Sequence, residues 1–427
     1  MNNLSKTDLI NIVVIGFAIF SMLFGAGNVV FPPYLGFHAR ESWLIAFIAY
    51  FIADIGLGIV GFIAIKNCGS SEGVTKQTNK FWGTVIMTTI MLCVGPLIAF
   101  PRTIATTFEM SVSPFFPEVS NILFSFAFGV LTFFLTVKQS KVIDIVGKYL
   151  TPILLIGLTI LIICGIFNPA LTTALPSESN IFETSIKTGY QTLDAAAVLV
   201  FGSIILLSIQ NKGYQDPQNS NKVLIYSLIV SSILLFLVYG GLCYLGAYAS
   251  ADISKSITRT ELLKTILQNL MGKAGLIIFA VVVFMACFTT AIALLSATSK
   301  YFSELTKGKI SYKTFCIIIS LFGAITSSKG LDVIVAFASP ILDLVYPPLL
   351  VLIFVGAFCP GLFRKAIIGG AITATIISVL NIINTFIYPI NIVTKLPMHN
   401  LGLGWFIPTL VVMAICQIFK SQHQENQ

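Results

Sequence analysis

The sequence FGAGNVVFPP at residues 24–33 lies inside an apolar segment that is long enough to cross a membrane. Glycine lowers the cost of leaving helical geometry, and irregular backbone at membrane depth is tolerated only where it lines a cavity or is covered by protein. A helix broken here exposes carbonyl groups at the end of its first half and N–H groups at the start of its second half, which together can bind a cation and a carboxylate. We therefore predict a binding site at Gly25, Ala26, Gly27 and Asn28. Alternatively, Gly25 and Gly27 are small packing residues and the two prolines only kink the helix.

The composition excludes an ordinary water-soluble protein. The chain has 427 residues, of which 56% are hydrophobic and only 10% are charged, whereas about a quarter of the residues in soluble proteins are charged. Backbone groups in lipid must be hydrogen-bonded internally, so the long apolar segments predict helices rather than a barrel. The chain is therefore predicted to be an all-α polytopic membrane protein that forms one integral membrane domain over residues 1–427.

About twelve spans are predicted. They fall near residues 9–37, 43–65, 82–108, 119–137, 149–168, 189–210, 223–248, 275–299, 314–328, 333–358, 366–388 and 404–419. The segment 331–358 is long and carries Pro340, Pro347 and Pro348, so it could contain a hairpin or a broken helix. Eleven or thirteen spans therefore stay open as alternatives.

The charges give the orientation. The formal net charge of +8 does not indicate nucleic-acid binding, because the charges lie in short loops between apolar segments. Most of the 25 lysine and arginine residues share one side if the N-terminus is inside. The positive-inside rule then predicts that both termini are cytoplasmic. The N-terminal apolar segment has no small-residue cleavage site, so it is interpreted as the first span and not as a signal peptide.

A second interruption is predicted in the sixth span, where residues 189–204 read GYQTLDAAAVLVFGSI. A carboxylate is costly in hydrocarbon, so Asp194 indicates a polar cavity or an ion path, unless it lies at the outer boundary as a cap or ion-pair partner. Interruptions in the first and sixth spans are what five spans repeated in inverted orientation would give. The repeats would cover about 9–168 and 189–358, followed by two extra helices at about 366–419.

Other polar residues also lie within predicted spans. Thr289 and Thr290 offer adjacent hydroxyl groups suited to an alkali cation, or they bond to a carbonyl one turn earlier in their own helix. Arg102 follows Pro96 and Pro101, and Glu109 lies two helical turns further on, so the two form either an ion pair or substrate contacts. Asp54 is expected to pair with a nearby polar group or to cap a helix end close to it.

Residues 252–271 mix leucine, isoleucine and charged side chains at helical spacing. This pattern predicts a short amphipathic helix on the outer face. A gating role and a passive solvated helix are both compatible with it.

Three long motifs resemble those of the bacterial branched-chain amino acid:cation symporters. They are SMLFGAGNVVFPPYLG at 21–36, GPLIAFPRT at 95–103 and GYQTLDAAAVLVFGSI at 189–204, and the resemblance extends over nearly the whole chain. It implies import of leucine, isoleucine and valine across the bacterial cytoplasmic membrane, driven by sodium or, in some members, by protons. It also implies a LeuT-like fold with five-plus-five inverted repeats and broken first and sixth helices.

The same resemblance assigns roles to single residues. It implies that Ala26 and Gly27 supply the amides that bind the substrate carboxylate, within the unwound stretch Gly25–Asn28. The carbonyls of Ala195, Ala196 and Val198 would face the substrate amine, just before the segment that contains Gly202. A sodium site would be formed by two helices; its members are Ser21, Phe24, Ala286, Thr289 and Thr290. Asp194 departs from the wider pattern, which leaves its role open.

These observations together predict a secondary symporter that works by alternating access and is not an enzyme. No organic cofactor is expected, because the mechanism needs only a coupling cation, Na⁺ or H⁺. A membrane enzyme is disfavoured because the three histidines lie near span ends and form no HExxH motif. A channel is disfavoured because no loop that resembles an ion-selectivity filter is repeated in the sequence. A transporter of another small solute is the alternative, and the sequence leaves the coupling ion and the oligomeric state open.

Overall fold

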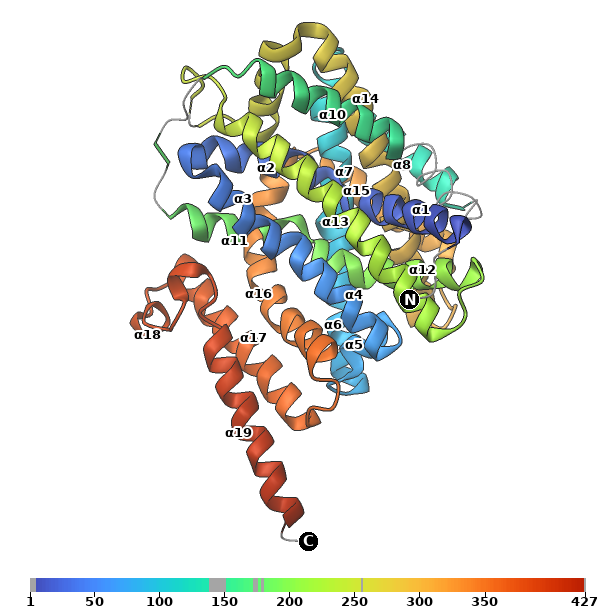
Figure 1. Cartoon of the computed structure of the whole chain (residues 1–427), viewed down its shortest axis with the longest axis vertical. Helices are drawn as coiled ribbons and strands as arrows, with labels where there is room; N and C mark the ends of the chain where they lie inside the picture. Colours follow the sequence, from blue (N-terminus) through green and yellow to red (C-terminus); the bar gives the residue numbers. More distant parts are fainter. Residues whose placement is uncertain (1–4, 138–150, 172–175, 178–179, 255, 426–427) are drawn as a thin grey trace. The chain divides into compact units, whose positions relative to one another are not determined.

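The computed structural model is all-helical in the part of the chain that it describes (Figure 1), which is residues 5–425 except 138–150, 172–175, 178–179 and 255. Eight described helical stretches are long and apolar enough to cross a membrane, and shorter apolar helices accompany them. This confirms the predicted all-α membrane class. Residues 149 and 150, which were expected to begin the fifth span, lie outside the described residues.

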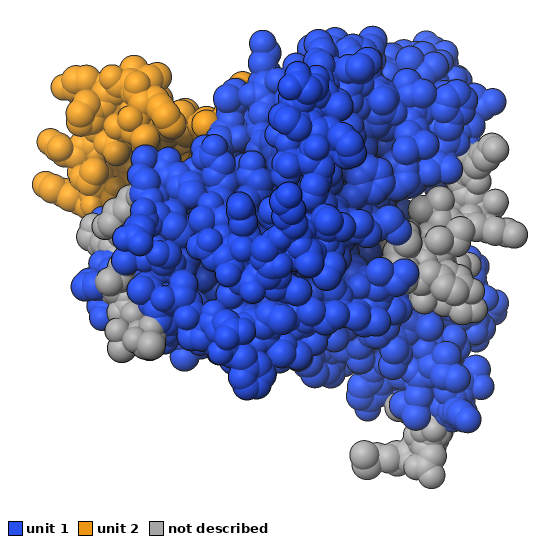
Figure 2. All heavy atoms as spheres, turned by 90° about the horizontal axis from the view of Figure 1, so that it is seen from above, with its two compact units in different colours: residues 1–51, 92–181, 204–335 blue, residues 52–91, 182–203, 336–427 orange. Residues whose placement is uncertain are grey.

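The chain forms two compact units, shown in Figure 2 in blue and orange. Unit 1 comprises Met1–Phe51, Leu92–Ile181 and Ile204–Val335, and unit 2 comprises Ile52–Met91, Phe182–Ser203 and Ala336–Gln427. Each unit therefore draws on segments that are far apart in the sequence.

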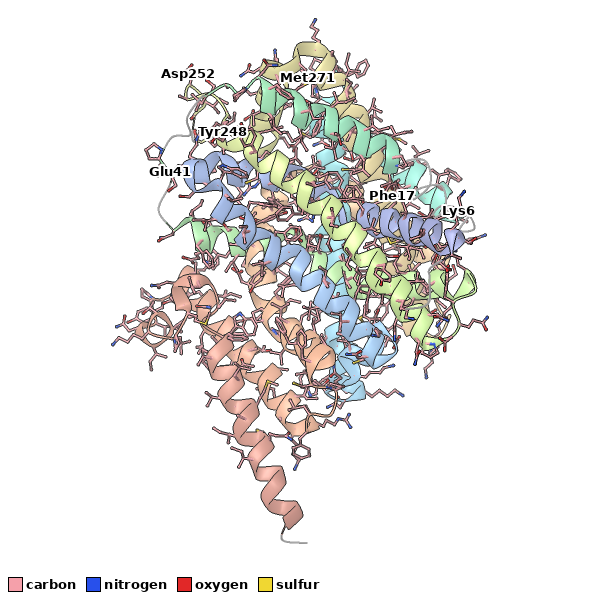
Figure 3. All side chains as sticks on the ribbon, viewed as in Figure 1. Lys6, Phe17, Glu41, Tyr248, Asp252 and Met271 are labelled. Carbon is pink, nitrogen blue, oxygen red and sulfur yellow. The ribbon has the colours of Figure 1, made fainter. Side chains whose placement is uncertain are left out.

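Unit 1 is built mainly around two long helices, α13 and α14. Its helices are α1 (Lys6–Leu23), α2 (Ala26–Ala39), α3 (Trp43–Phe51), α7 (Ala99–Thr107), α8 (Asn121–Val137), α10 (Thr151–Phe167), α13 (Pro217–Ala247), α14 (Arg259–Leu305) and α15 (Tyr312–Ser327). α13 packs along α1 and α2, and α14 packs against α7, α8, α10 and α15. In Figure 3 the label Lys6 marks the start of α1 and the label Glu41 marks the turn after α2, so the broken first span runs between them.

Two glycines set how closely α2 approaches α13. A Cβ atom added at Gly36 would lie 1.9 Å from the carbonyl oxygen of Cys243, and one added at Gly246 would lie 1.9 Å from the carbonyl oxygen of Pro33. The two helices therefore meet backbone to backbone, as small residues allow in membranes.

Unit 2 contains α4 (Leu57–Cys68), α5 (Ser71–Lys76), most of α6 (Lys80–Leu92), most of α11 (Ile181–Thr192), α17 (Arg364–Phe386), the short α18 (Asn391–Thr394) and α19 (Phe406–Glu425). α17 packs along α19. Two further helices, α12 (Asp194–Asn211) and α16 (Leu331–Phe358), belong partly to each unit.

The predicted span at 333–358 is one helix in the structure, α16, which runs over Leu331–Phe358 with three prolines inside it, so the open alternative of a hairpin is excluded. One expectation about a helix boundary is corrected. The outer amphipathic segment does not begin at residue 252: helix begins at Arg259, after a Thr258 cap, and continues into the eighth span across a bend at Gly272, which has φ 60°. The Thr258–Glu261 capping box explains this start, because it satisfies the first free N–H groups.

Candidate binding site at the broken helices

The first span is interrupted where the sequence predicts, at Phe24 and Gly25. α1 ends at Leu23 and α2 begins at Ala26, and the Gly25 backbone is extended at φ −110° and ψ −166°. The N-cap residue is Gly25, which has no side chain to cap α2. The buried N-terminus of a helix favours a negatively charged ligand.

A buried cation lies beside this N-terminus. The Arg102 side chain, on α7, is 5% exposed, and a Cβ atom added at Gly27 would lie 3.1 Å from its Nη2. The Arg102 guanidinium also lies over the Phe31 ring, with Cζ 5.7 Å from the ring centroid. Gly27 therefore leaves room for the arginine at the start of α2, where both groups attract an anion.

The break in the first span lies next to the helix that carries Thr289 and Thr290. A Cβ atom added at Gly25 would lie 3.4 Å from Cγ2 and 3.7 Å from Oγ1 of Thr290, so the break in the first span adjoins α14. The hydroxyl groups of Thr289 and Thr290 both donate to the Ala286 carbonyl at 2.9 Å. The predicted alternative of bonding within the helix is therefore observed. A hydroxyl that donates one hydrogen bond still has lone pairs to offer a cation.

Asn28 is held in place by a residue that the sequence analysis passed over. Its Nδ2 donates to the Tyr239 hydroxyl at 2.6 Å, across 211 residues of sequence. Tyr239 is fully buried and its ring stacks with Phe24, at 6.0 Å between centroids. No local pattern links Tyr239 to the break, because the packing of α13 on α2 creates the contact.

Glu109 fixes two other segments of unit 1. Its carboxylate accepts hydrogen bonds from the Thr260 hydroxyl at 2.9 Å and from the Leu331 N–H at 2.7 Å. It therefore ties the π-helical turn Phe108–Val112 to the starts of α14 and α16. The expected pairing of Glu109 with Arg102 stays a prediction.

In unit 2, the sixth span is broken as predicted, at Leu193. This residue has φ 73°, which is rare for a side chain with a Cβ, and it separates α11 from α12. Asp194 then lies in the first turn of α12 and is 3% exposed, a position where the helix dipole stabilises a carboxylate. Asp54, in the π-helical turn Ile52–Gly56, accepts a hydrogen bond of 2.7 Å from the Thr192 hydroxyl, so it pairs as expected and holds the residue before the break.

The remaining predicted residues of unit 2 lie in the tightly packed first half of α12. Ala195, Ala196 and Val198 are buried, and the Val198 side chain faces α4, 3.1 Å from a Cβ atom added at Gly61. A Cβ atom added at Gly202 would lie 2.4 Å from Cδ1 of Ile65. The close packing of α12 against Ile65 is thus sufficient to explain why residue 202 is a glycine.

An all-helical membrane fold, with a helix broken at membrane depth beside a buried arginine, is typical of secondary transporters. Solved structures with a similar fold include a Na⁺-coupled sialic acid symporter (TM-score 0.63, 12% identity, covering 96% of this chain and 90% of that one) and the nucleobase-cation-symport-1 family transporter Mhp1 (TM-score 0.60, 14% identity, covering 95% and 93%). At this identity the likeness shows a shared fold and nothing further.

Sequence comparison identifies the family. A family model described as branched-chain amino acid transport protein matches residues 8–423. The chain is 31% identical to the branched-chain amino acid permease BrnQ of Bacillus subtilis over 95% of this chain and 96% of that protein. It is 30% identical to the branched-chain amino acid transport system 2 carrier protein of Pseudomonas aeruginosa, covering 98% and 97%. The chain belongs to the branched-chain amino acid transport protein family.

Proposed function

We propose that this protein imports leucine, isoleucine and valine across the bacterial cytoplasmic membrane in symport with a cation, by alternating access. The observation that carries the proposal is the uncapped N-terminus of α2 beside the buried guanidinium of Arg102. A zwitterionic substrate needs such an anion site for its carboxylate, and the names of the relatives supply the substrate class.

In this proposal, the amides of Ala26 and Gly27 and the cation of Arg102 bind the α-carboxylate. The carbonyls of Ala195, Ala196 and Val198 accept hydrogen bonds from the α-ammonium. A branched aliphatic side chain contributes about 0.8 kcal/mol for each methylene group that it buries.

The coupling ion is proposed to be sodium, bound by the carbonyls of Ser21, Phe24 and Ala286 and the hydroxyls of Thr289 and Thr290. The support is the position of Gly25 next to Thr290. Hard oxygen ligands of this kind suit an alkali cation. If protons are the coupling ion, Asp194, Asp54 and Glu109 are the candidate carriers, because a carboxylate within the membrane can bind a proton.

The membrane arrangement is part of the proposal. Twelve spans, a five-plus-five inverted repeat followed by two extra helices, and two cytoplasmic termini fit the helix order and the distribution of basic residues.

Uptake by purified protein in liposomes tests the proposal. Radiolabelled leucine should accumulate when an inward sodium gradient is imposed, and unlabelled isoleucine or valine should compete while lysine should not. Accumulation of leucine under a proton gradient alone would identify the proton as the coupling ion. Equal competition by lysine would exclude selectivity for branched-chain amino acids.

A further inference from the structure

Unit 2 contains a polar cavity of about 240 Å³ that the proposed transport mechanism does not use. Polar side chains from three helices line the cavity. They are Glu183, Lys187 and Tyr190 of α11, Asp343 of α16, and Ser378 and Asn381 of α17. Glu183, Lys187 and Tyr190 are spaced four and three residues apart, which places them on one face of α11. His399 and Trp405, which follow α18, complete the lining.

Asp343 is the unusual member of this set. It lies near the middle of α16, between Pro340 and Pro347, and is only partly exposed. Its carboxylate makes no hydrogen bond to another residue in the part of the chain that the structure describes. A carboxylate within a membrane helix is costly unless a positive charge compensates it, and it marks a functional site by default.

The charges that line the cavity do not cancel. The Lys187 Nζ lies 2.6 Å from Oε1 of Glu183 and its charge also acts on Asp343, so two carboxylates share one ammonium. With Asp343 ionised, the side chains of Glu183, Lys187 and Asp343 sum to one negative charge. Tyr190, another titratable group in the lining, is neutral at ordinary pH. The cavity therefore lacks one positive charge.

Three buried polar atoms in the lining also lack partners. The Ser378 hydroxyl, with its side chain 1% exposed, the Trp405 indole N–H, with its side chain 3% exposed, and the His399 Nδ1 make no hydrogen bond among the described residues. Nearly all buried polar groups in native proteins have a partner. A hydroxyl oxygen and a carboxylate beside a space large enough for water are consistent with a hydrated ligand.

We propose that this cavity binds a sodium ion, with the Asp343 carboxylate and the Ser378 hydroxyl as ligands. A hard cation takes oxygen ligands, and a single carboxylate matches the charge of a monovalent ion. Water molecules complete its coordination and accept the hydrogen bond of the Trp405 N–H. This site goes beyond the proposed function, because it is separate from Thr289 and Thr290 and needs no amino acid to form.

Equilibrium dialysis of the full-length purified protein against ²²Na⁺, without leucine, tests the proposal. Asp343→Asn should bind one sodium ion fewer than the wild-type chain, because the amide keeps the shape and removes the charge. Thr385→Val is the control: it changes a residue of the same lining whose hydroxyl already donates to the Asn381 carbonyl, it leaves the charge of the cavity as it is, and it should leave the number of bound ions unchanged. Asp343→Asn that binds as many ions as wild type would overturn the proposal.

Two further variants keep the outcome decisive. If Asp343→Asn does not fold, Ser378→Ala keeps the charge and should weaken sodium binding by roughly tenfold, as the loss of one ligand implies; unchanged binding would reject the site. Thr290→Val tests the other sodium site independently. If Thr290→Val leaves the count unchanged while Asp343→Asn lowers it, the cavity site stands and the coupling site at α14 fails.

Discussion

At the scale of single residues, Thr289 and Thr290 show how one geometry serves two roles. Both hydroxyls donate to the Ala286 carbonyl, which satisfies their hydrogens inside the helix. Their remaining lone pairs can still bind a cation next to Gly25. Bonding within the helix and sodium binding are therefore compatible, and removal of the oxygen distinguishes them.

Thr289→Val and Thr290→Val should each raise the sodium concentration that gives half-maximal leucine uptake. Valine keeps the side-chain volume and removes the ligand oxygen, so the fold should be retained. By linkage, sodium should also strengthen leucine binding less in these variants than in the wild type. Uptake in proteoliposomes at graded sodium concentrations measures the effect.

Thr290→Ser is the control for these variants, because it keeps the hydroxyl and should respond to sodium nearly as the wild type does. If both valine variants are expressed normally and keep the wild-type sodium response, the hydroxyls bond only within their helix and the site is elsewhere.

Gly27→Ala should weaken leucine binding. The added Cβ would lie 2.9 Å from Cε2 of Phe31 and 3.1 Å from Nη2 of Arg102, so the arginine must move away from the start of α2. In Gly25→Ala the nearest atom to the added Cβ is Cγ2 of Thr290, at the ordinary contact distance of 3.4 Å, so this variant should have the smaller effect on leucine affinity. Binding of radiolabelled leucine at saturating sodium compares the two, and equal affinities for wild type and Gly27→Ala would remove Arg102 from the proposed carboxylate site.

At the scale of elements, both helix breaks were predictable from sequence. The glycines of FGAGN and the carboxylate of Asp194 have unfavourable positions in an unbroken apolar helix, so each break has a local signal. The structure interrupts the helices at Phe24–Gly25 and at Leu193. Polar residues at membrane depth are informative because they are costly in hydrocarbon, so an ordinary membrane span consists of apolar residues.

Contacts between distant elements had no such signal. Tyr239 reaches Asn28, and Thr192 reaches Asp54, only because their helices pack together. The start of α11 at Ile181, earlier than the predicted span at 189, was hidden because the Glu183–Lys187 pair lowers the local hydropathy. Asp343 does have a sequence signal, because it is a charge within an apolar segment, although it is not among the predicted site residues.

The close crossing of α2 and α13 gives a prediction at this scale. Gly36→Ala and Gly246→Ala should each destabilise the protein strongly, because the added methyl group meets backbone at 1.9 Å and backbone cannot rotate away. Overpacking commonly costs about 1–3 kcal/mol, and more where nothing can yield. Thermal unfolding in detergent should show a lower midpoint or no folded protein.

Gly361→Ala is the matched control for this crossing, since no other group lies within 4 Å of a Cβ added there. Its midpoint should equal that of the wild type. Wild-type stability in Gly36→Ala would mean that α2 and α13 are not in direct backbone contact.

At the scale of the whole molecule, the fold and the transported solute are separate questions. Structures with a similar fold, at 12% and 14% identity, belong to a sialic acid symporter and to a nucleobase-cation-symport-1 family transporter with bromovinylhydantoin bound. A shared fold therefore does not define the substrate, which depends on the residues around the breaks and on the family. Orientation, by contrast, is a property of the whole chain, because it depends on how basic residues are shared between the two sides.

The predicted orientation places the loop between α13 and α14, where Figure 3 labels Asp252, outside the cell, and the turn between α14 and α15 inside. Asp252 and Lys309 are both exposed, so each is a suitable position for a single cysteine. Cys359 is also exposed and is replaced by serine in both variants. A membrane-impermeant maleimide should label Asp252→Cys in intact cells and Lys309→Cys only after permeabilisation. Because lysine and arginine retain loops in the cytoplasm, the opposite labelling pattern would reverse the topology and with it the expected direction from which the amino acid enters.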